Sequence, residues 1–247
     1  MAFGVFDRKE ARIVPNTAMV TVKSPSSASR HKLVTHYLLL AFAFFFLCGT
    51  VFIVNNPSSS ATGVRAYSAK ESSKAHLIYG TAWKKGETAR LVSEAVKTGF
   101  RFIDTACQPK HYDEASVGDG WSAAAQELGL TRGDIWLQTK FTPLSGQDPF
   151  NVPYNKELPI DQQAKESLEV SLKNLKVDYL DSWVLHSPPG SFEDLMTVWR
   201  VMEEAVDTDR VLHIGISNCY DIDTFRLLYQ QARRKPSVSD QLFFVRS

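Results

Sequence analysis

The chain has 247 residues, of which 44% are hydrophobic, and its 28 basic side chains balance 27 acidic ones, so it can bury a sizeable core but has no strong overall electrostatic field. Apart from the basic triplet at 233–235, basic residues are interleaved with acidic ones and form no stripe that could follow a phosphate backbone, which argues against a nucleic-acid partner. The three cysteines, Cys48, Cys107 and Cys219, indicate neither a disulfide framework nor a structural zinc site, so no metal is expected.

Residues 1–36 are predicted to be a disordered tail, and a long apolar run follows them. From Tyr37 to Val54 the sequence reads YLLLAFAFFFLCGTVFIV, which is 18 residues without a charge. This length is at the lower limit for a bilayer-crossing helix, and the alternative of a buried core helix would normally show one polar stripe. A cleaved signal peptide is the other alternative, but the 36 preceding residues are far more than an ordinary charged n-region. We therefore predict a single transmembrane helix over 37–54 that is retained as an anchor.

Basic residues on either side of the run set its predicted orientation. Within 15 residues, Lys23, Arg30 and Lys32 precede the run and only Arg65 follows it, which favours a cytosolic N-terminus and a single-pass, type II membrane protein. A window of 20 residues makes the counts equal, at three on each side, and removes this asymmetry. Residues 55–75 are rich in Ser and Ala and are predicted to be a flexible stalk before a folded domain over 76–247.

Short apolar runs alternate with amphipathic segments throughout this domain. Five runs predict buried parallel strands, at residues 76–79, 101–105, 135–140, 182–186 and 211–216. The helical patterns between and after them keep one apolar face each, and these faces include Val92, Trp121, Leu128, Leu172, Trp199 and Leu228. Strict alternation implies right-handed crossovers and a parallel sheet, either open and doubly wound or closed into a barrel.

The residues that follow the strands favour the barrel. The sequence GTAW at 80–83 stands where a dinucleotide-binding open sheet would have a Gly-x-Gly-x-x-Gly turn. The second to fifth runs end in polar residues, which are Asp104, Lys140, His186, and Ser217 with Asn218. The C-terminal ends of barrel strands converge on one mouth, which is where a barrel enzyme needs its polar groups.

In type and order, these residues resemble the signature series of the aldo-keto reductases. The matching segments are FIDTA at 102–106 followed by Tyr112 and Glu114, QTKF at 138–141, DYLD at 178–181 leading to HSP at 186–188, and GISN at 215–218. The resemblance covers about residues 76–236. Behind the disordered tail and the transmembrane helix, it implies an α/β fold: a partial TIM (β/α)8 barrel with about five βα units and the start of a sixth.

The resemblance implies reduction of a small-molecule carbonyl, an aldehyde or ketone, to an alcohol by hydride transfer. Tyr112 would act as the general acid, because the negative charge that develops on the carbonyl oxygen requires a proton donor. Lys140 would favour the ionised form of this phenol, and Asp104 would keep Lys140 charged and oriented. His186 would hold or polarise the carbonyl oxygen. Taken alone, each of these residues also fits a purely structural interpretation.

The resemblance also implies a nicotinamide cofactor, with NADP favoured over NAD by family habit. Ser217 and Asn218 would bind the nicotinamide carboxamide through hydrogen bonds. Gly80 and Thr81 would approach the ribose or pyrophosphate, and Asp104 is also expected to bind the cofactor.

Other residues near the predicted site leave alternatives open. Trp83 and Trp183 each fit either a pocket wall or the core. Cys107 and Cys219 are expected to line the pocket without acting as nucleophiles, because neither has an assigned base or cation. The insertion at 142–159 fits either a pocket lining or a cover over the barrel rim.

The length of the domain differs from that of a complete barrel. Four strand-helix units take up residues 77–211, so eight would need on the order of 260 residues, and only 36 follow residue 211. The tail SDQLFFVRS at 239–247 is expected to leave the family pattern. We therefore expect a C-terminally truncated product of a longer reductase with little turnover. Two functions stay open: an active, membrane-tethered reductase of aldehydes or ketones, or a catalytically weak or inactive cofactor-binding scaffold fragment of an aldo-keto reductase.

Overall fold

The computed structural model describes residues 3–6, 13–16, 51–52 and 76–240, and the chain divides into two compact units. One unit contains β1 (Phe3–Phe6) and β2 (Ile13–Asn16), which pair antiparallel. These two strands differ from the prediction of a disordered tail over 1–36, and both contain aromatic or β-branched residues, which favour strands. The rest of the tail and the predicted stalk over 55–75 lie outside the described residues.

The other unit is built on a seven-stranded sheet in the order β3-β4-β5-β6-β7-β8-β9. The strands are β3 (Val51–Phe52), β4 (His76–Gly80), β5 (Phe102–Asp104), β6 (Trp136–Phe141), β7 (Leu180–Leu185), β8 (Val211–Ser217) and β9 (Val238–Asp240). β3 pairs antiparallel with β4, and all the later neighbours pair parallel. The five predicted strands are confirmed as β4 to β8.

β9 corrects the prediction for the end of the domain. Only the start of a sixth unit was predicted, and the tail over 239–247 was expected to leave the family pattern. The strand instead continues to Asp240, because Val238, Ser239 and Asp240 pair in register with Gly215, Ile216 and Ser217 of β8.

The apolar run Tyr37–Val54 is described only at Val51 and Phe52. These two residues form β3, a strand where a transmembrane helix was predicted, because they pair with Leu77 and His76 of β4. In the described parts of the chain, every helix is too short or too polar to cross a bilayer. The rest of the run lies outside the described residues, so the anchor over 37–54 and its type II orientation stay proposals.

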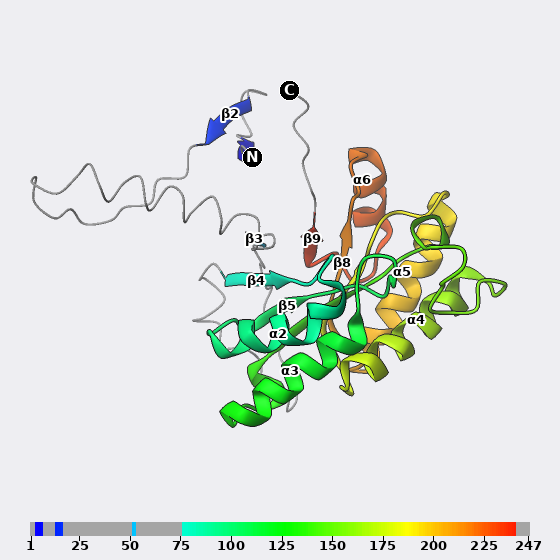
Figure 1. The fold of residues 1–247 in the computed structure, drawn as a ribbon. Coiled ribbons are helices and arrows are strands. Elements are labelled where there is room, and N and C mark those ends of the chain that lie inside the picture. Colours follow the sequence, from blue (N-terminus) through cyan, green and yellow to red (C-terminus); the bar gives the residue numbers. More distant parts are fainter. Residues whose placement is uncertain (1–2, 7–12, 17–50, 53–75, 241–247) are drawn as a thin grey trace, which may run out of the picture. The chain divides into compact units, whose positions relative to one another are not determined.

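Helices connect the successive parallel strands. α2 (Thr88–Lys97), α3 (Glu114–Leu128), α4 (Ile160–Leu175), α5 (Phe192–Asp207) and α6 (Ile222–Gln231) follow β4 to β8 in turn. The loops add the short helices η1 (Lys85–Glu87), η2 (Arg132–Asp134) and η3 (Leu144–Gly146). Consecutive helices from α2 to α5 pack on one another beside the strands (Figure 1). Strands added in one direction by right-handed crossovers place all their helices on one side of the sheet, so the winding is that of a barrel segment rather than a doubly wound sheet.

One hydrophobic core joins this helix layer to the sheet. Each helix contributes its predicted apolar face, including the buried residues Val92, Trp121, Leu172, Trp199 and Leu228. Strand residues such as Ile103, Leu137 and Leu185 face them in the same cluster. Leu128 differs from the prediction, because it is the last residue of α3 and its side chain is 43% exposed.

The start of α3 is fixed by a helix cap. The Asp113 side chain accepts a hydrogen bond from the backbone N–H of Ser116 at 3.0 Å. Such a cap satisfies a backbone donor that the first turn of a helix leaves without a partner. Tyr112 directly precedes this cap, so its backbone is held at a defined position at the end of a helix.

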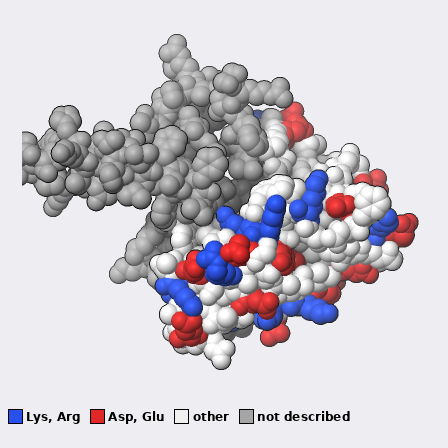
Figure 2. Space-filling view, in the orientation of Figure 1, with Lys and Arg blue, Asp and Glu red and all other residues white. Residues whose placement is uncertain are grey.

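Charged side chains of both signs are mixed over the face drawn in Figure 2. Local ion pairs account for several of them, and Arg90, for example, lies 2.7 Å from both Glu87 and Glu94. The basic triplet at 233–235 is tied to α5, because Arg233 and Arg234 both pair with Asp207. These two guanidinium groups lower the pKa of Asp207 to about 2.

The contact between α3 and α4 gives a test of the fold. A Cβ added at Gly118 would lie 2.0 Å from the backbone oxygen of Asn174 in α4, so the two helices would have to separate. We expect Gly118→Ala to destabilise the chain by about 1–3 kcal/mol, as overpacking does, in urea unfolding followed by circular dichroism. Gly86→Ala is the matched control, because a Cβ there meets nothing within 4 Å. Equal unfolding midpoints for the two variants would contradict this packing.

Candidate active site

Polar side chains gather where the parallel strands end. Asp104 is the last residue of β5, Lys140 is next to last in β6, and His186 follows β7 directly. The in-register pairs Asp104 with Gln138 and Lys140 with Val184 align these strands. The C-terminal ends of neighbouring parallel strands lie at one edge, so the sheet brings side chains from three separate segments together.

The centre of this cluster is a buried ion pair. The Lys140 side chain is 2% exposed and its ammonium contacts Asp104 Oδ1. The same ammonium donates to the backbone oxygen of Thr105 at 2.9 Å. Gln138 Nε2 donates to Asp104 Oδ1 at 2.8 Å, and Ser182 Oγ donates to Gln138 Oε1 at 2.9 Å. These extra hydrogen bonds matter because a buried pair is tolerated only when its remaining polar atoms are satisfied.

The Tyr112 ring lies over this pair and beside His186. Lys140 Nζ is 5.5 Å from the centre of the Tyr112 ring. The centres of the Tyr112 and His186 rings are 6.0 Å apart, with the rings edge to face at 71°. The structure therefore brings all four predicted catalytic side chains into one cluster, which consists of Asp104, Tyr112, Lys140 and His186. Their chemical roles remain predictions.

His186 is held at three points. Its backbone N–H donates to Phe141 O at 2.8 Å, and its carbonyl accepts from Asn218 Nδ2, also at 2.8 Å. Its Nδ1 lies 2.7 Å from Thr142 Oγ1. Burial, the positive charge of Lys140 and the nearby His111 together lower the pKa of His186 to about 3. The imidazole is therefore neutral at physiological pH.

The predicted cofactor residues lie at the same strand ends. The side chains of Thr81 and Asn218 already form hydrogen bonds within the protein. Gly80 pairs in register with Asp104, and the buried Thr81 donates its hydroxyl to Asp104 O at 2.9 Å. Asn218 adopts a left-handed backbone conformation with φ 52°, which asparagine tolerates better than most residues. Its Nδ2 also donates to Ser217 Oγ at 3.1 Å, and its Oδ1 accepts from Tyr220 Oη at 2.8 Å.

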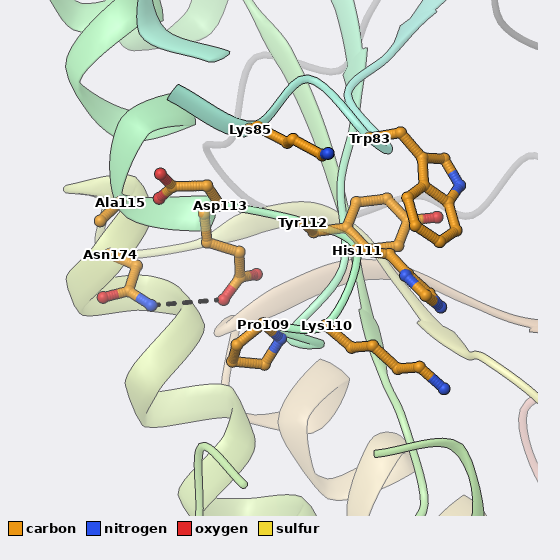
Figure 3. Close-up of a pocket in the computed structure, with 10 residues that line it drawn as sticks. Trp83, Lys85, Pro109, Lys110, His111, Tyr112, Asp113, Ala115 and Asn174 are labelled. Atoms are coloured by element: carbon orange, nitrogen blue, oxygen red, sulfur yellow. Dashed lines mark hydrogen bonds between the residues drawn. The ribbon is translucent and has the colours of Figure 1, made fainter. Parts of the chain in front are cut away.

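A cavity of about 380 Å³ adjoins Tyr112 on the side of η1 and α3 (Figure 3). Its lining comprises Trp83, Lys85, Pro109, Lys110, His111, Tyr112, Asp113, Glu114, Ala115 and Asn174. Trp83 is 63% exposed and its ring lies 3.8 Å from that of His111, so it is a pocket wall, whereas Trp183 is fully buried in the core. Of the two roles that the sequence left open for each tryptophan, Trp83 therefore lines a pocket and Trp183 fills the core.

Glu114 forms a second buried polar cluster behind Tyr112. Its carboxylate accepts from Thr139 Oγ1 at 2.5 Å, from Ser171 Oγ at 2.9 Å and from Asn174 Nδ2 at 3.5 Å, the last drawn as the dashed line in Figure 3. Burial raises the pKa of this carboxyl above its usual range. Burial likewise raises the pKa of the neighbouring Cys107 thiol, which agrees with the expectation that it is not a nucleophile.

Several contributors to the site were not predicted as functional residues. Gln138 orients Asp104, Thr142 contacts His186, and His111 stacks on Trp83. Gln138 was in principle detectable, because it lies two residues before Lys140 in a strand and therefore points to the same face. Thr142 and His111 lie outside regular strands, where sequence spacing does not fix the direction of a side chain.

Comparison with known proteins gives a consistent result. A model of the Aldo/keto reductase family matches residues 76–243, so the family pattern extends beyond Val238, where it was expected to end. An uncharacterized oxidoreductase of Schizosaccharomyces pombe is 32% identical over an alignment of 170 positions that covers 62% of this chain and 47% of that protein. Glycerol 2-dehydrogenase (NADP(+)) of Hypocrea jecorina is 29% identical over an alignment of 178 positions that covers 63% of this chain and 51% of that protein.

The fold has the same relatives. The crystal structure of an aldo/keto reductase from Brucella melitensis matches with a TM-score of 0.54 and 28% identity, covering 67% of this chain and 57% of that one. The chain spans about half the length of the curated relatives it matches.

The lowered pKa of His186 predicts a pH dependence of stability. The unfolded chain takes up a proton on this imidazole near its ordinary pKa of 6.5, whereas the folded chain does so only near about 3. Stability is therefore lost as the pH falls through this window. Between about pH 7 and about pH 4.5, we expect the unfolding free energy of the wild type to fall on the order of 2 kcal/mol more than that of His186→Gln. Urea unfolding at several pH values measures this difference, and parallel curves for the two proteins would refute it.

Proposed function

Because the chain belongs to the aldo/keto reductase family, we propose that it reduces an aldehyde or ketone to an alcohol with NADPH. The observation that carries the proposal is the buried ion pair of Lys140 and Asp104 beneath the Tyr112 ring, with the neutral His186 beside it. We also propose that the arc from β4 to β9 is part of a (β/α)8 barrel, which is supported by its sequential parallel order and by the Brucella melitensis structure.

Tyr112 is the proposed proton donor. Hydride addition to a carbonyl carbon leaves negative charge on the oxygen, and the Tyr112 hydroxyl supplies the proton that neutralises it. The charge of Lys140, 5.5 Å from the ring centre, stabilises the phenolate that remains. Asp104 keeps that ammonium charged and in place, because an unpaired cation would be costly at a site only 2% exposed.

His186 is proposed to hold the carbonyl oxygen. Its imidazole is neutral, so it donates a hydrogen bond without adding a second positive charge beside Lys140. A neutral donor at a preorganised position stabilises developing charge on an oxygen without the cost of burying another ion.

The strand ends offer a suitable donor and acceptor set for the cofactor. Bound there, a reduced nicotinamide would supply the hydride. Asn218 and Ser217 have the amide and hydroxyl groups that a carboxamide needs, although Asn218 Oδ1 already accepts from Tyr220 Oη. Tyr220 is 56% exposed, so its hydroxyl can turn toward solvent and free that oxygen. NADP is favoured over NAD because a related protein, the glycerol 2-dehydrogenase, carries NADP(+) in its name.

Binding of the cofactor can be tested separately from turnover. Trp83 is 63% exposed at the cavity, so we expect NADPH to quench its fluorescence, and Trp83→Phe to remove most of the change. The fully buried Trp183 and Trp199 provide an unchanged background. NADH should require at least about tenfold higher concentration for the same quenching. Equal quenching by both nucleotides would contradict the preference for NADP, and no quenching by either would contradict the cofactor site.

Turnover tests the proton donor. Oxidation of NADPH in the presence of benzaldehyde is followed by loss of absorbance and is expected to be slow in the 247-residue chain. We expect Tyr112→Phe to lower kcat by at least about a hundredfold below the wild-type value, because it removes the acid. Tyr229→Phe is the matched control, since this half-exposed tyrosine lies on α6 away from the cluster. Cofactor binding without turnover by the wild type would favour the scaffold alternative over the reductase.

A further inference from the structure

We propose that Thr142 is a positioning residue that fixes which nitrogen of His186 carries the proton. Its hydroxyl donates to Nδ1, so the neutral imidazole keeps its proton on Nε2. From there the N–H can donate a hydrogen bond to a carbonyl oxygen. This inference rests on the proposed reductase function. It assigns a role to the first residue of the 142–159 insertion, which the sequence left undecided.

The direction of the hydrogen bond follows from what surrounds the hydroxyl. Thr142 is 2% exposed, and its Oγ1 lies 2.7 Å from His186 Nδ1. Within the part of the chain that the structure describes, that nitrogen is the only hydrogen-bond partner of Oγ1. If Nδ1 carried the proton, the hydroxyl would accept it and its own proton would be buried without an acceptor, which is unfavourable. The hydroxyl therefore donates, and Nδ1 accepts.

The insertion holds the backbone of Thr142 in place. Its carbonyl oxygen accepts two side-chain hydrogen bonds, from Tyr154 Oη at 2.7 Å and from Gln147 Nε2 at 3.1 Å. Gln147 Nε2 also donates to Cys107 O at 2.9 Å, which ties the insertion to the loop that leads to Tyr112. Both Tyr154 and Gln147 are buried. The 142–159 segment therefore supports the site through buried hydrogen bonds and does not merely cover the barrel rim.

The backbone of His186 is fixed independently. Its N–H bonds to Phe141 O and its carbonyl accepts from Asn218 Nδ2, both at 2.8 Å. Because the backbones of both Thr142 and His186 are held by these bonds, Thr142 Oγ1 and His186 Nδ1 are already in contact. Neither segment has to become ordered when a substrate binds. Because the buried ring is neutral beside Lys140 and His111, only one of its nitrogens carries a proton, and the contact with Thr142 selects which one.

The tautomer can be measured without any substrate. In the full chain labelled with ¹⁵N-histidine, long-range ¹H–¹⁵N spectra distinguish a protonated from an unprotonated ring nitrogen, and the His186 signals are assigned by their absence in His186→Gln. We expect wild-type His186 to show Nε2 protonated and Nδ1 unprotonated. A wild-type spectrum with Nδ1 protonated would overturn the proposal, whatever the activity.

Variants separate positioning from simple loss of stability. Thr142→Val keeps the shape and removes the hydroxyl, so we expect a mixture of tautomers, whereas Thr142→Ser should restore the wild-type spectrum. Thr139→Val is the matched control, because it removes another buried hydroxyl, one in the preceding strand β6 that bonds Glu114, and it should leave the His186 tautomer unchanged. An unchanged tautomer in Thr142→Val, or an equal change in Thr139→Val, would contradict the assignment.

Measurements of kcat separate the role of Thr142 in setting the tautomer from the proposed reductase function. We expect Thr142→Val to lower kcat for benzaldehyde roughly tenfold and Thr142→Ser to stay within about twofold of wild type. If the wild type shows the expected tautomer but no turnover, the reductase proposal fails while the role of Thr142 in setting the tautomer stands. If the wild type turns over and Thr142→Val matches it in both kcat and spectrum, the role of Thr142 fails and the reductase stands.

Discussion

The burial of the Lys140 ammonium is the constraint on which the rest of the site depends. An ammonium that is 2% exposed must have a carboxylate partner, and Asp104 of β5 supplies it. This carboxylate accepts from Gln138 of β6, whose amide oxygen accepts in turn from Ser182 of β7. Each partner can reach the next only if the three strands pair in the observed register. The observed register of the sheet is therefore also the condition for the buried ion pair and its hydrogen bonds to form.

Two neighbouring residues of β6 place the proposed acid from opposite sides. Side chains alternate along a strand, so Thr139 faces the helices while Lys140 faces the site. Thr139 bonds Glu114, two residues after Tyr112, and Lys140 lies beneath the Tyr112 ring. The loop that carries the phenol is thus held by the same strand that supplies the cation, which explains how a loop side chain keeps a defined position.

The electrostatics of the cluster favour one cation and one neutral imidazole. Asp104 balances the charge of Lys140, and burial together with that charge disfavours a second charge on His186, whose pKa is lowered to about 3. Thr142 and Asn218 then hold the neutral residue through its ring and its backbone. The result is a proposed proton donor, a cation and a neutral imidazole in one cluster, which suits a carbonyl that gains negative charge on its oxygen.

The sequence by itself determined the five parallel strands, the helices between them and the residues at the strand ends, because buried strands and amphipathic helices have periodicities that can be read directly. It also determined the family, since Asp104, Lys140 and His186 follow in a specific order. The tertiary structure alone decided that β9 continues to Asp240, that Trp83 lines a cavity while Trp183 fills the core, and that Thr142 meets His186. These features depend on contacts between segments distant in sequence, and loop side chains have no periodicity that reveals their direction.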